Sequence, residues 1–360
     1  MGIYNVPWRL VQNKLVRYPG GREIDKFRGI NPGEDDGRPE AWIGSDTRVC
    51  NVGPDDPNEG CQECILPDGR RMYLFEAVAE NPEGVLGKKH MEINGTSMAV
   101  LVKLLDAEKQ LDLQSHPDRD FAKKYFNSDY GKAECWYIIG KRDDVPEPPY
   151  VLMGFKEGVT REVFAKHYYN EDLPSMEACC HKVPVEIGDC FNIEAGVPHA
   201  VGAGCFVVEV QEPSDVTAFT WKLKDGTDEE KAFHDEQQLG CYHYEGHSYE
   251  DNLKIRLIPP VTIREGDWGT EKIVLGTRNT PYFSFTRIDA SGEVPVTKTG
   301  FPQVCICLSG DCRLVYEGGE MEIKKADEFF FPANIGDIKI VPGEEGVSMV
   351  LCHPQGYVCE

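Results

Sequence analysis

Long hydrophobic runs are missing from this chain of 360 residues. No segment approaches the ~20 uninterrupted apolar residues that a membrane-spanning helix needs, and residues 1–9 lack the apolar stretch of a signal peptide. Hydrophobic residues still make up 41% of the chain, which is enough for a core. We therefore expect a soluble, cytoplasmic, globular protein, and its length favours two domains or one domain with a large insertion.

Basic side chains are also scarce. The chain has 38 Lys and Arg against 61 Asp and Glu, a formal charge of -23 at pH 7. Nucleic acids and anionic membranes are held by clustered cations, so this balance disfavours both as partners. A small basic pocket for a small molecule remains compatible with it.

The chain also lacks a second CxxC motif. The chain has 14 cysteines, and one pair, Cys61 and Cys64, has this spacing. Without a partner motif it is at most half of a zinc knuckle, so we favour an ordinary loop with two thiols. A structural metal or a redox pair, with Cys50 as a further thiol, is the alternative. The other cysteines are expected to be reduced and packed as small hydrophobes.

Short strand patterns fill most of the chain after an irregular segment of about 60 residues. The expected strands cover 71–76, 98–105, 111–116, 135–139, 183–193, 205–210, 284–288, 304–308, 313–316, 321–323 and 329–331. Between about 159 and 181 the pattern becomes helical, with Thr160 as a helix cap. Residues 225–234 suit a charged loop or a short helix. This spacing predicts a mostly β protein of the sandwich or jelly-roll type with a helical insertion.

One pattern occurs twice. Val185–Asp189 followed by Pro198 and His199 is echoed by Ile323–Glu328 followed by Pro332, but only the first copy carries a histidine. We therefore predict two jelly-roll barrels, of which the first binds metal and the second does not. The predicted domains are residues 1–255, including the irregular segment and the insertion, and residues 256–360.

Three short segments offer metal ligands: Gln114 with His116, then Glu134, then His199. Alternation places Gln114 and His116 on the same strand face, together with Asp112. Two imidazoles, a carboxylate and an amide oxygen suit a divalent cation such as zinc, with a position left open for water or substrate. Each residue alone has a plainer interpretation: a structural histidine, a Glu134–Lys132 ion pair, or a polar rim residue.

The segments around these residues resemble the type I mannose-6-phosphate isomerases, which are zinc-dependent cupins. The matching segments are Leu113–Asp118, Gly131–Ile138, Ile193–Gly202, Glu40–Ser45, Val208–Gln211 and Ser214–Asp215. The resemblance runs from about Trp42 through Pro354 and includes the order of strands, helical insertion and second barrel. It implies two cupin-like barrels and a metal-dependent aldose–ketose isomerase that acts on mannose 6-phosphate and fructose 6-phosphate, or on a related sugar.

The resemblance also implies particular roles for residues. One zinc ion, or another divalent metal, would be held by Gln114, His116, Glu134 and His199. The candidate catalytic residues are Lys132, Glu209 and Glu40, and the candidate substrate-pocket residues are Trp42, Asp112, Phe219 and Lys222. The expected partner is a small sugar or sugar phosphate that isomerises through an enediol. The oligomeric state is left open.

Two positions depart from the family pattern. Phe219 stands where the family usually has an arginine, and an apolar ring cannot stabilise an enediolate or hold an anion. Lys222 or Lys224 lies near enough in sequence to replace it. Asp112 stands where the family generally has a serine, and its carboxylate would repel a phosphate dianion. These changes keep a second hypothesis open, a noncatalytic metal-containing cupin that binds or senses a carbohydrate. A cupin oxygenase is a third hypothesis, which the ligand set mildly disfavours.

Overall fold

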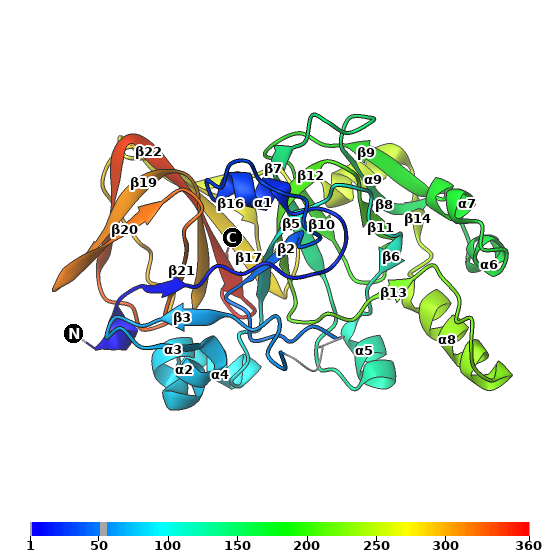
Figure 1. The fold of residues 1–360 in the computed structure, drawn as a ribbon, viewed down its shortest axis with the longest axis horizontal. Coiled ribbons are helices and arrows are strands. Elements are labelled where there is room, and N and C mark those ends of the chain that lie inside the picture. The colour runs from blue at the N-terminus through cyan, green and yellow to red at the C-terminus, as the bar shows by residue number, and fades with distance from the viewer. Residues whose placement is uncertain (1, 51–55, 360) are drawn as a thin grey trace.

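Strands predominate in residues 2–50 and 56–359, which the computed structural model describes (Figure 1). The largest sheet has 11 strands. Its main path is β15 (Val261–Gly266), β16 (Gly269–Leu275), β17 (Phe283–Ala290), β22 (Ile338–Pro354), β19 (Gln303–Tyr316), β21 (Glu328–Phe331), β1 (Trp8–Leu10), β3 (Glu63–Ile65) and β4 (Arg71–Tyr73). Two further strands pair beside this path, β18 (Val294–Pro295) with β22 and β20 (Gly319–Lys324) with β19.

The central part of the chain forms two smaller sheets. The five-stranded sheet runs β10 (Cys190–Ile193), β7 (Glu134–Lys141), β12 (Cys205–Gln211), β5 (Leu101–Asp106) and β2 (Glu40–Ile43). The six-stranded sheet runs β13 (Ala218–Phe219), β6 (Gln114–Ser115), β11 (His199–Val201), β8 (Tyr150–Lys156) and β14 (Gly246–His247), with β9 (Cys180–Pro184) also paired to β8. Hydrophobic side chains from both sheets, such as Trp136, Val207, Met153 and Val201, form one core between them.

The fold is mostly β and cupin-like, as expected, but the two barrels are not confirmed. Within the described part of the chain each sheet is an open path with two edge strands, such as β15 and β4 in the largest sheet. The segment expected to be irregular also contributes β1, β2 and β3. Because β1 pairs with β21, through Trp8 and Phe330, the start of the chain completes a sheet made mostly of residues 261–354. The division into domains at residue 255 stays a prediction.

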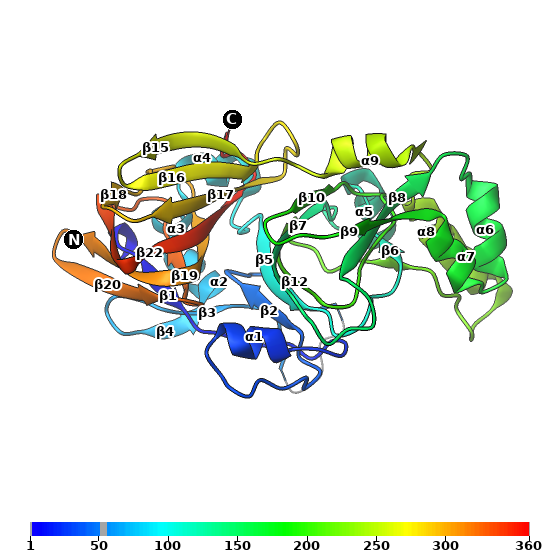
Figure 2. The same ribbon diagram turned by 90° about the horizontal axis from the view of Figure 1, so that it is seen from above.

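The expected helical insertion is present, and further helices accompany it. The helices are α1 (Arg22–Phe27), α2 (Leu74–Glu80), α3 (Pro82–Leu86), α4 (Lys88–Asn94), α5 (Arg119–Phe126), α6 (Arg161–Tyr169), α7 (Leu173–Ala178), α8 (Asp228–Cys241) and α9 (Tyr249–Arg256), with a 3-10 turn at Ile3–Asn5. Thr160 caps α6 as predicted, because its side chain accepts the backbone N–H of Val163. Figures 1 and 2 both place α6, α7 and α8 at one end of the molecule, away from the 11-stranded sheet. No helix in the described ranges is long and apolar enough to cross a membrane.

Two local predictions need correction. The strand expected over residues 71–76 ends at Tyr73, and α2 begins at Leu74, where the Glu76 carboxylate accepts the backbone N–H of Tyr73. The charged loop or short helix expected near residues 225–234 is the 14-residue helix α8. A capping box starts α8: Thr227 accepts the N–H of Glu230, and the Glu230 carboxylate accepts the N–H of Thr227.

Most charged residues of the five-stranded sheet lie on one of its faces, and Asp106 at the end of β5 lies on the other. Along β7, Cys135 and Tyr137 contribute to the core shared with the 11-stranded sheet. Glu134 and Trp136 alternate with them and therefore point toward the six-stranded sheet. Lys103 on β5 and Glu209 on β12 lie opposite each other in register on this same inner face. Side chains far apart in the sequence thus converge between the two smaller sheets.

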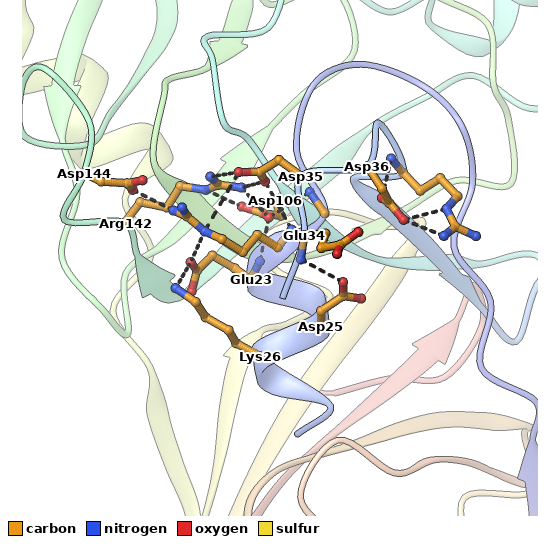
Figure 3. Close-up of polar contacts among 12 residues, drawn as sticks. Glu23, Asp25, Lys26, Glu34, Asp35, Asp36, Asp106, Arg142 and Asp144 are labelled. Atoms are coloured by element: carbon orange, nitrogen blue, oxygen red, sulfur yellow. Dashed lines mark hydrogen bonds and ion pairs between the residues drawn. The ribbon is translucent and has the colours of Figure 1, made fainter. Parts of the chain in front are cut away.

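A buried arginine fastens the segment containing α1 to this sheet (Figure 3). The Arg142 guanidinium donates to Asp106 at 2.8 and 2.6 Å and to Asp35 at 3.0 and 2.5 Å. Hydrogen bonding to Arg142 lowers the pKa of Asp35. Asp106 also accepts the backbone N–H groups of Gly21 and Glu23 at the start of α1. We call Arg142, Asp35 and Asp106 the arginine clamp.

We predict that Arg142→Met lowers the free energy of unfolding by about 3–5 kcal/mol, because it leaves the buried Asp106 carboxylate without its cation. Urea unfolding measures the loss, and hydrogen exchange should become faster in residues 20–36. Arg313→Gln is the control, because Arg313 pairs with the half-exposed Glu320 in the 11-stranded sheet, away from the clamp. It should leave the urea midpoint nearly unchanged. Equal shifts for both variants would contradict the special role of the clamp.

Candidate active site

Three side chains that could hold a metal ion meet between the two smaller sheets. His116, Glu134 and His199 are buried, and their ligand atoms all lie within 4.8 Å of one another. His116 Nε2 is 3.1 Å from Glu134 Oε2, while His199 Nε2 is 3.1 Å from His116 Nε2 and 3.4 Å from Glu134 Oε1. Across residues 2–50 and 56–359, this is the one such group of histidine, cysteine and acidic side chains.

Strand register explains how the three segments meet. His199 opens β11 and pairs with Gln114 of β6, so that His116 lies just beyond that pair. The backbone N–H of Gly196 donates to the His116 carbonyl at 2.7 Å, which ties the turn before His199 to the other histidine. Glu134 enters from the facing sheet as the first residue of β7. The convergence predicted from the three segments is therefore present for these three residues.

Burial sets the protonation states of the group. Burial, followed by the neighbouring Lys132 ammonium, lowers the pKa of His116 to about 3, and burial lowers the pKa of His199. Burial alone would raise the pKa of Glu134, but the positive charge of Lys132 and contributions from the two imidazoles hold it well below its usual value. Two neutral imidazoles and an ionised carboxylate are the forms that bind metals.

The nitrogen and oxygen atoms of this group are arranged to bind a cation rather than to hydrogen-bond to one another. His199 Nδ1 lies 2.8 Å from the Val197 carbonyl, which places the proton on Nδ1 and leaves Nε2 as an acceptor. Lys132 Nζ donates to His116 Nε2 at 2.6 Å and to Glu134 Oε2 at 2.9 Å, so His116 Nε2 is also an acceptor. Glu134 Oε1 is buried without a hydrogen-bond partner among the described residues. Facing lone pairs this close favour a divalent metal between them.

A cavity of about 410 Å³ adjoins the group. Lys132 and Trp136 connect the two, because both line the cavity while Lys132 contacts His116 and Glu134 and the Trp136 ring lies edge-on to His199. The wall is completed by residues of both smaller sheets and of the segment held by the arginine clamp. Its lining also includes Arg17, Tyr18, Glu40, Lys103, Asp112, Gln114, Glu209, Asp215 and Phe219.

Glu209 is the least exposed of the carboxylates that line the cavity. Its Oε2 accepts the indole N–H of Trp136 at 3.0 Å, and its Oε1 lies 3.0 Å from Lys103 Nζ. Burial, followed by the negative charge of Glu134, raises the pKa of Glu209. Burial alone would lower the pKa of Lys103, but Glu209 and Glu40 together raise it. A buried carboxylate with a raised pKa can accept and return a proton.

Most of the site residues predicted from the sequence lie together. The predicted residues in the cavity wall are Glu40, Asp112, Gln114, Lys132, Glu209 and Phe219. Trp42 lies behind the wall, where its indole N–H donates to Glu40 at 2.7 Å. The structure does not bring Lys222 to the cavity: its ammonium lies 5.8 Å from the ring centroid of Tyr169. Lys224 is exposed and also outside the wall.

Three further wall residues, Lys103, Arg17 and Tyr18, were not predicted. The sequence did contain a signal for Lys103, because a single lysine inside the apolar run 101–105 needs a buried partner. Arg17 donates to both oxygens of Asp215 at 2.8 Å, and no sequence pattern foretold this pairing across 198 positions. Gly20 allows the approach of this segment: its φ is +143°, and a Cβ there would lie 2.1 Å from the Asp106 carbonyl oxygen.

The CxxC cysteines lie apart from the site. Cys64 belongs to β3 and is buried in the core shared by the sheets, and Cys61 is buried before it. Burial raises the pKa of Cys64 to about 12, which keeps it a thiol. Neither cysteine joins a group of metal-ligating side chains in the described part of the chain.

A mostly β cupin-like fold with a buried His-Glu-His group defines a cupin that could hold a metal. Comparison with known proteins narrows this class. A family model described as "Mannose-6-phosphate isomerase, cupin domain" matches residues 277–349, which lie in the region of the 11-stranded sheet. Among solved structures, the mannose 6-phosphate isomerase of Bacillus subtilis superposes with a TM-score of 0.75 at 21% identity, covering 96% of this chain and 99% of that one.

Curated relatives match a larger share of the chain than the family model does. The chain is 29% identical over 275 residues to the probable mannose-6-phosphate isomerase GmuF of Bacillus subtilis (strain 168), covering 74% of this chain and 80% of that protein. It is 28% identical over 276 residues to the mannose-6-phosphate isomerase of Streptococcus mutans serotype c, covering 72% and 79%. The family model, the curated relatives and the solved structure together make the chain similar to the type I mannose-6-phosphate isomerases, which are cupins.

Proposed function

We propose that this protein is a metal-dependent aldose–ketose isomerase that interconverts mannose 6-phosphate and fructose 6-phosphate, or a related pair of sugars. One observation carries the proposal: a buried carboxylate with a raised pKa, Glu209, shares a cavity with Lys132, which contacts the His116, Glu134 and His199 group. The names of the relatives support the same reaction.

Zinc, or another borderline divalent metal, would be held by His116, Glu134, His199 and Gln114. Gln114 lines the cavity and is paired in register with His199, so the two side chains share one face of the sheet, which supports Gln114 as the fourth ligand. When bound, the metal supplies a positive charge that polarises the oxygens at C1 and C2 of the sugar. The remaining steps are assigned to groups of the chain.

Glu209 is the proposed proton carrier. Its Oε1 accepts the proton from C2 of the aldose, which leaves an enediolate, and the same oxygen returns a proton to C1. A second proton moves from the C2 oxygen to the C1 oxygen, so the aldose becomes a ketose with no change in composition. A general base poised in this way typically contributes about 10²–10⁴-fold to the rate.

Two lysines assist this transfer: Lys132 stabilises the negative charge that develops on the sugar, and Lys103 orients the Glu209 carboxylate. Lys132 faces the cavity and is the cation nearest the metal group, so it can donate a hydrogen bond to a sugar oxygen as negative charge develops there. Lys103 keeps Glu209 oriented through their 3.0 Å contact. Glu40, fixed by the Trp42 indole, is positioned to accept a sugar hydroxyl.

The decisive experiment incubates metal-replete protein with aldoses, ketoses and their 6-phosphates in deuterated water. We expect deuterium at C1 of the ketose or C2 of the aldose for one sugar pair, detected by NMR, and we expect exchange to stop when a chelator removes the metal. Metal-replete protein that incorporates no deuterium into any sugar of the panel would refute the isomerase proposal.

A noncatalytic, carbohydrate-binding cupin is the second candidate. Phe219 favours it, because this ring occupies a wall position where a cation would be needed for an enediolate. It predicts saturable sugar binding without deuterium exchange. The same incubation, combined with a titration followed by calorimetry, separates the two functions.

A further inference from the structure

We propose that the cavity takes an unphosphorylated hexose in preference to a hexose phosphate. The inference builds on the proposed function, since it specifies the substrate class of the same site. It depends on the charges, the ion pairs and the aromatic residues of the cavity wall, which together offer little to a phosphate dianion.

The deep cations of the wall are already neutralised. Arg17 donates from Nη2 to both oxygens of Asp215 at 2.8 Å, and Asp215 also accepts the backbone N–H of Cys50. Lys103 lies 3.0 Å from Glu209. A dianion could engage either cation only by leaving a mostly buried carboxylate without its partner, which costs more than a surface pair would.

Lys132, the third deep cation, is committed in the same way. Its ammonium donates to Glu134 at 2.9 Å and to His116 at 2.6 Å, both of which are buried. With a metal bound, Lys132 would instead donate to the reacting sugar oxygen, as proposed above, and would not be available to a phosphate at C6. No deep cation of the described wall is left unpaired.

The rim adds an unpaired negative charge. Asp112 is exposed, lines the cavity, and makes no ion pair with any described residue. Lys132 does not neutralise Asp112, because Lys132 pairs with Glu134. Lys109 is the rim cation, also exposed. In all, four cationic and four acidic side chains line the cavity, on a chain whose formal charge is -23, so the side chains of the wall carry no net positive charge to attract a dianion.

The wall offers an apolar surface where a neutral sugar can bind. Phe219 lines the cavity, and Trp221 stacks on it with ring centroids 5.6 Å apart and planes 20° apart. Trp221 is 50% exposed, so the pair reaches from the wall to solvent. An aromatic face can contact the C–H groups of a pyranose while its hydroxyls bond to the neighbouring polar residues. The phosphate group gains nothing from such a surface.

The test measures both binding and turnover with zinc-loaded protein. Calorimetry and ligand-observed NMR at fixed ionic strength compare mannose with mannose 6-phosphate, and fructose with fructose 6-phosphate, alongside kcat/KM for each. We expect the neutral sugar to bind and to react at least about 10-fold better than its phosphate ester.

Three variants locate the effect. Asp112→Asn should raise the ratio of the affinity for the phosphate ester to the affinity for the neutral sugar about 3- to 10-fold. Glu108→Gln is the matched control, since it makes the same change in charge beside the rim but outside the cavity wall. Lys109→Met should leave both sugars nearly unaffected.

The outcomes separate the inference from the proposed function. Tighter binding of mannose 6-phosphate than of mannose, lost in Lys109→Met, would overturn the inference even if the protein is an isomerase. Binding of the neutral sugar without turnover would refute the isomerase proposal and support the inference. If neither the neutral sugars nor the phosphate esters bind, both the inference and the isomerase proposal are overturned.

Discussion

Glu134→Gln should remove the metal and lower kcat/KM by more than about 10³-fold. A metal contributes several kcal/mol to stabilising charge in a transition state, and a loss of about 4 kcal/mol corresponds to roughly 10³-fold in rate. Glu134 supplies the only negative charge in the His116, Glu134 and His199 group, and the neutral amide retains its shape. Metal content by mass spectrometry and kcat/KM on the preferred sugar are the two measurements.

A matched buried glutamate separates metal loss from destabilisation. Glu328 in the 11-stranded sheet has a side chain exposed to the same 1% as Glu134, and it pairs with Arg28 at 2.6 Å. Glu328→Gln should therefore lower the unfolding temperature while the metal content and kcat/KM stay close to wild type. If Glu134→Gln retained one metal ion per chain, or if Glu328→Gln lost it, the assignment of the metal site would be wrong.

The metal group could be predicted from the sequence because each ligand lies in a short local pattern. Alternation predicts one strand face for Gln114 and His116, although β6 ends at Ser115. Glu134 opens an apolar strand, and His199 follows a turn. Such patterns fix which way a side chain points once the strand forms. The pairing of His199 with Gln114 then follows from register alone.

The rest of the cavity could not be predicted in this way, because it depends on pairing between distant segments. Arg17 meets Asp215 only because the arginine clamp holds the segment that follows it to the five-stranded sheet. Likewise β1 joins the largest sheet through contacts between residues 8 and 330, which no local periodicity encodes. The length of helix α8 was underestimated for another reason. Its sequence is too polar to show a clear apolar stripe, although a capping box fixes its start.

The inner face of the five-stranded sheet unites these findings. Lys103, Glu134 and Glu209 occupy alternate positions on three adjacent strands, and buried hydrophobic residues occupy the positions between them. The outer face can thus pack against the 11-stranded sheet while the inner face keeps charged groups in a cavity. A one-residue slip of any of these strands would exchange the two sets, so strong packing on the outer face also fixes the register of the site.

Glu209→Gln should lower kcat about 10²–10⁴-fold while the metal stays bound, because the amide cannot accept the C2 proton. In wild type the base must be ionised, and burial and the charge of Glu134 raise the pKa of Glu209, so activity should rise with pH through a value above that of an ordinary glutamate. This limb of the pH profile should vanish in Glu209→Gln. Glu271→Gln is the control, because Glu271 is also buried and paired with an arginine, Arg264, but lies in the 11-stranded sheet outside the cavity wall. Deuterium exchange at C2 in Glu209→Gln at the wild-type rate would assign the proton transfer to another group, with Lys132 the next to test.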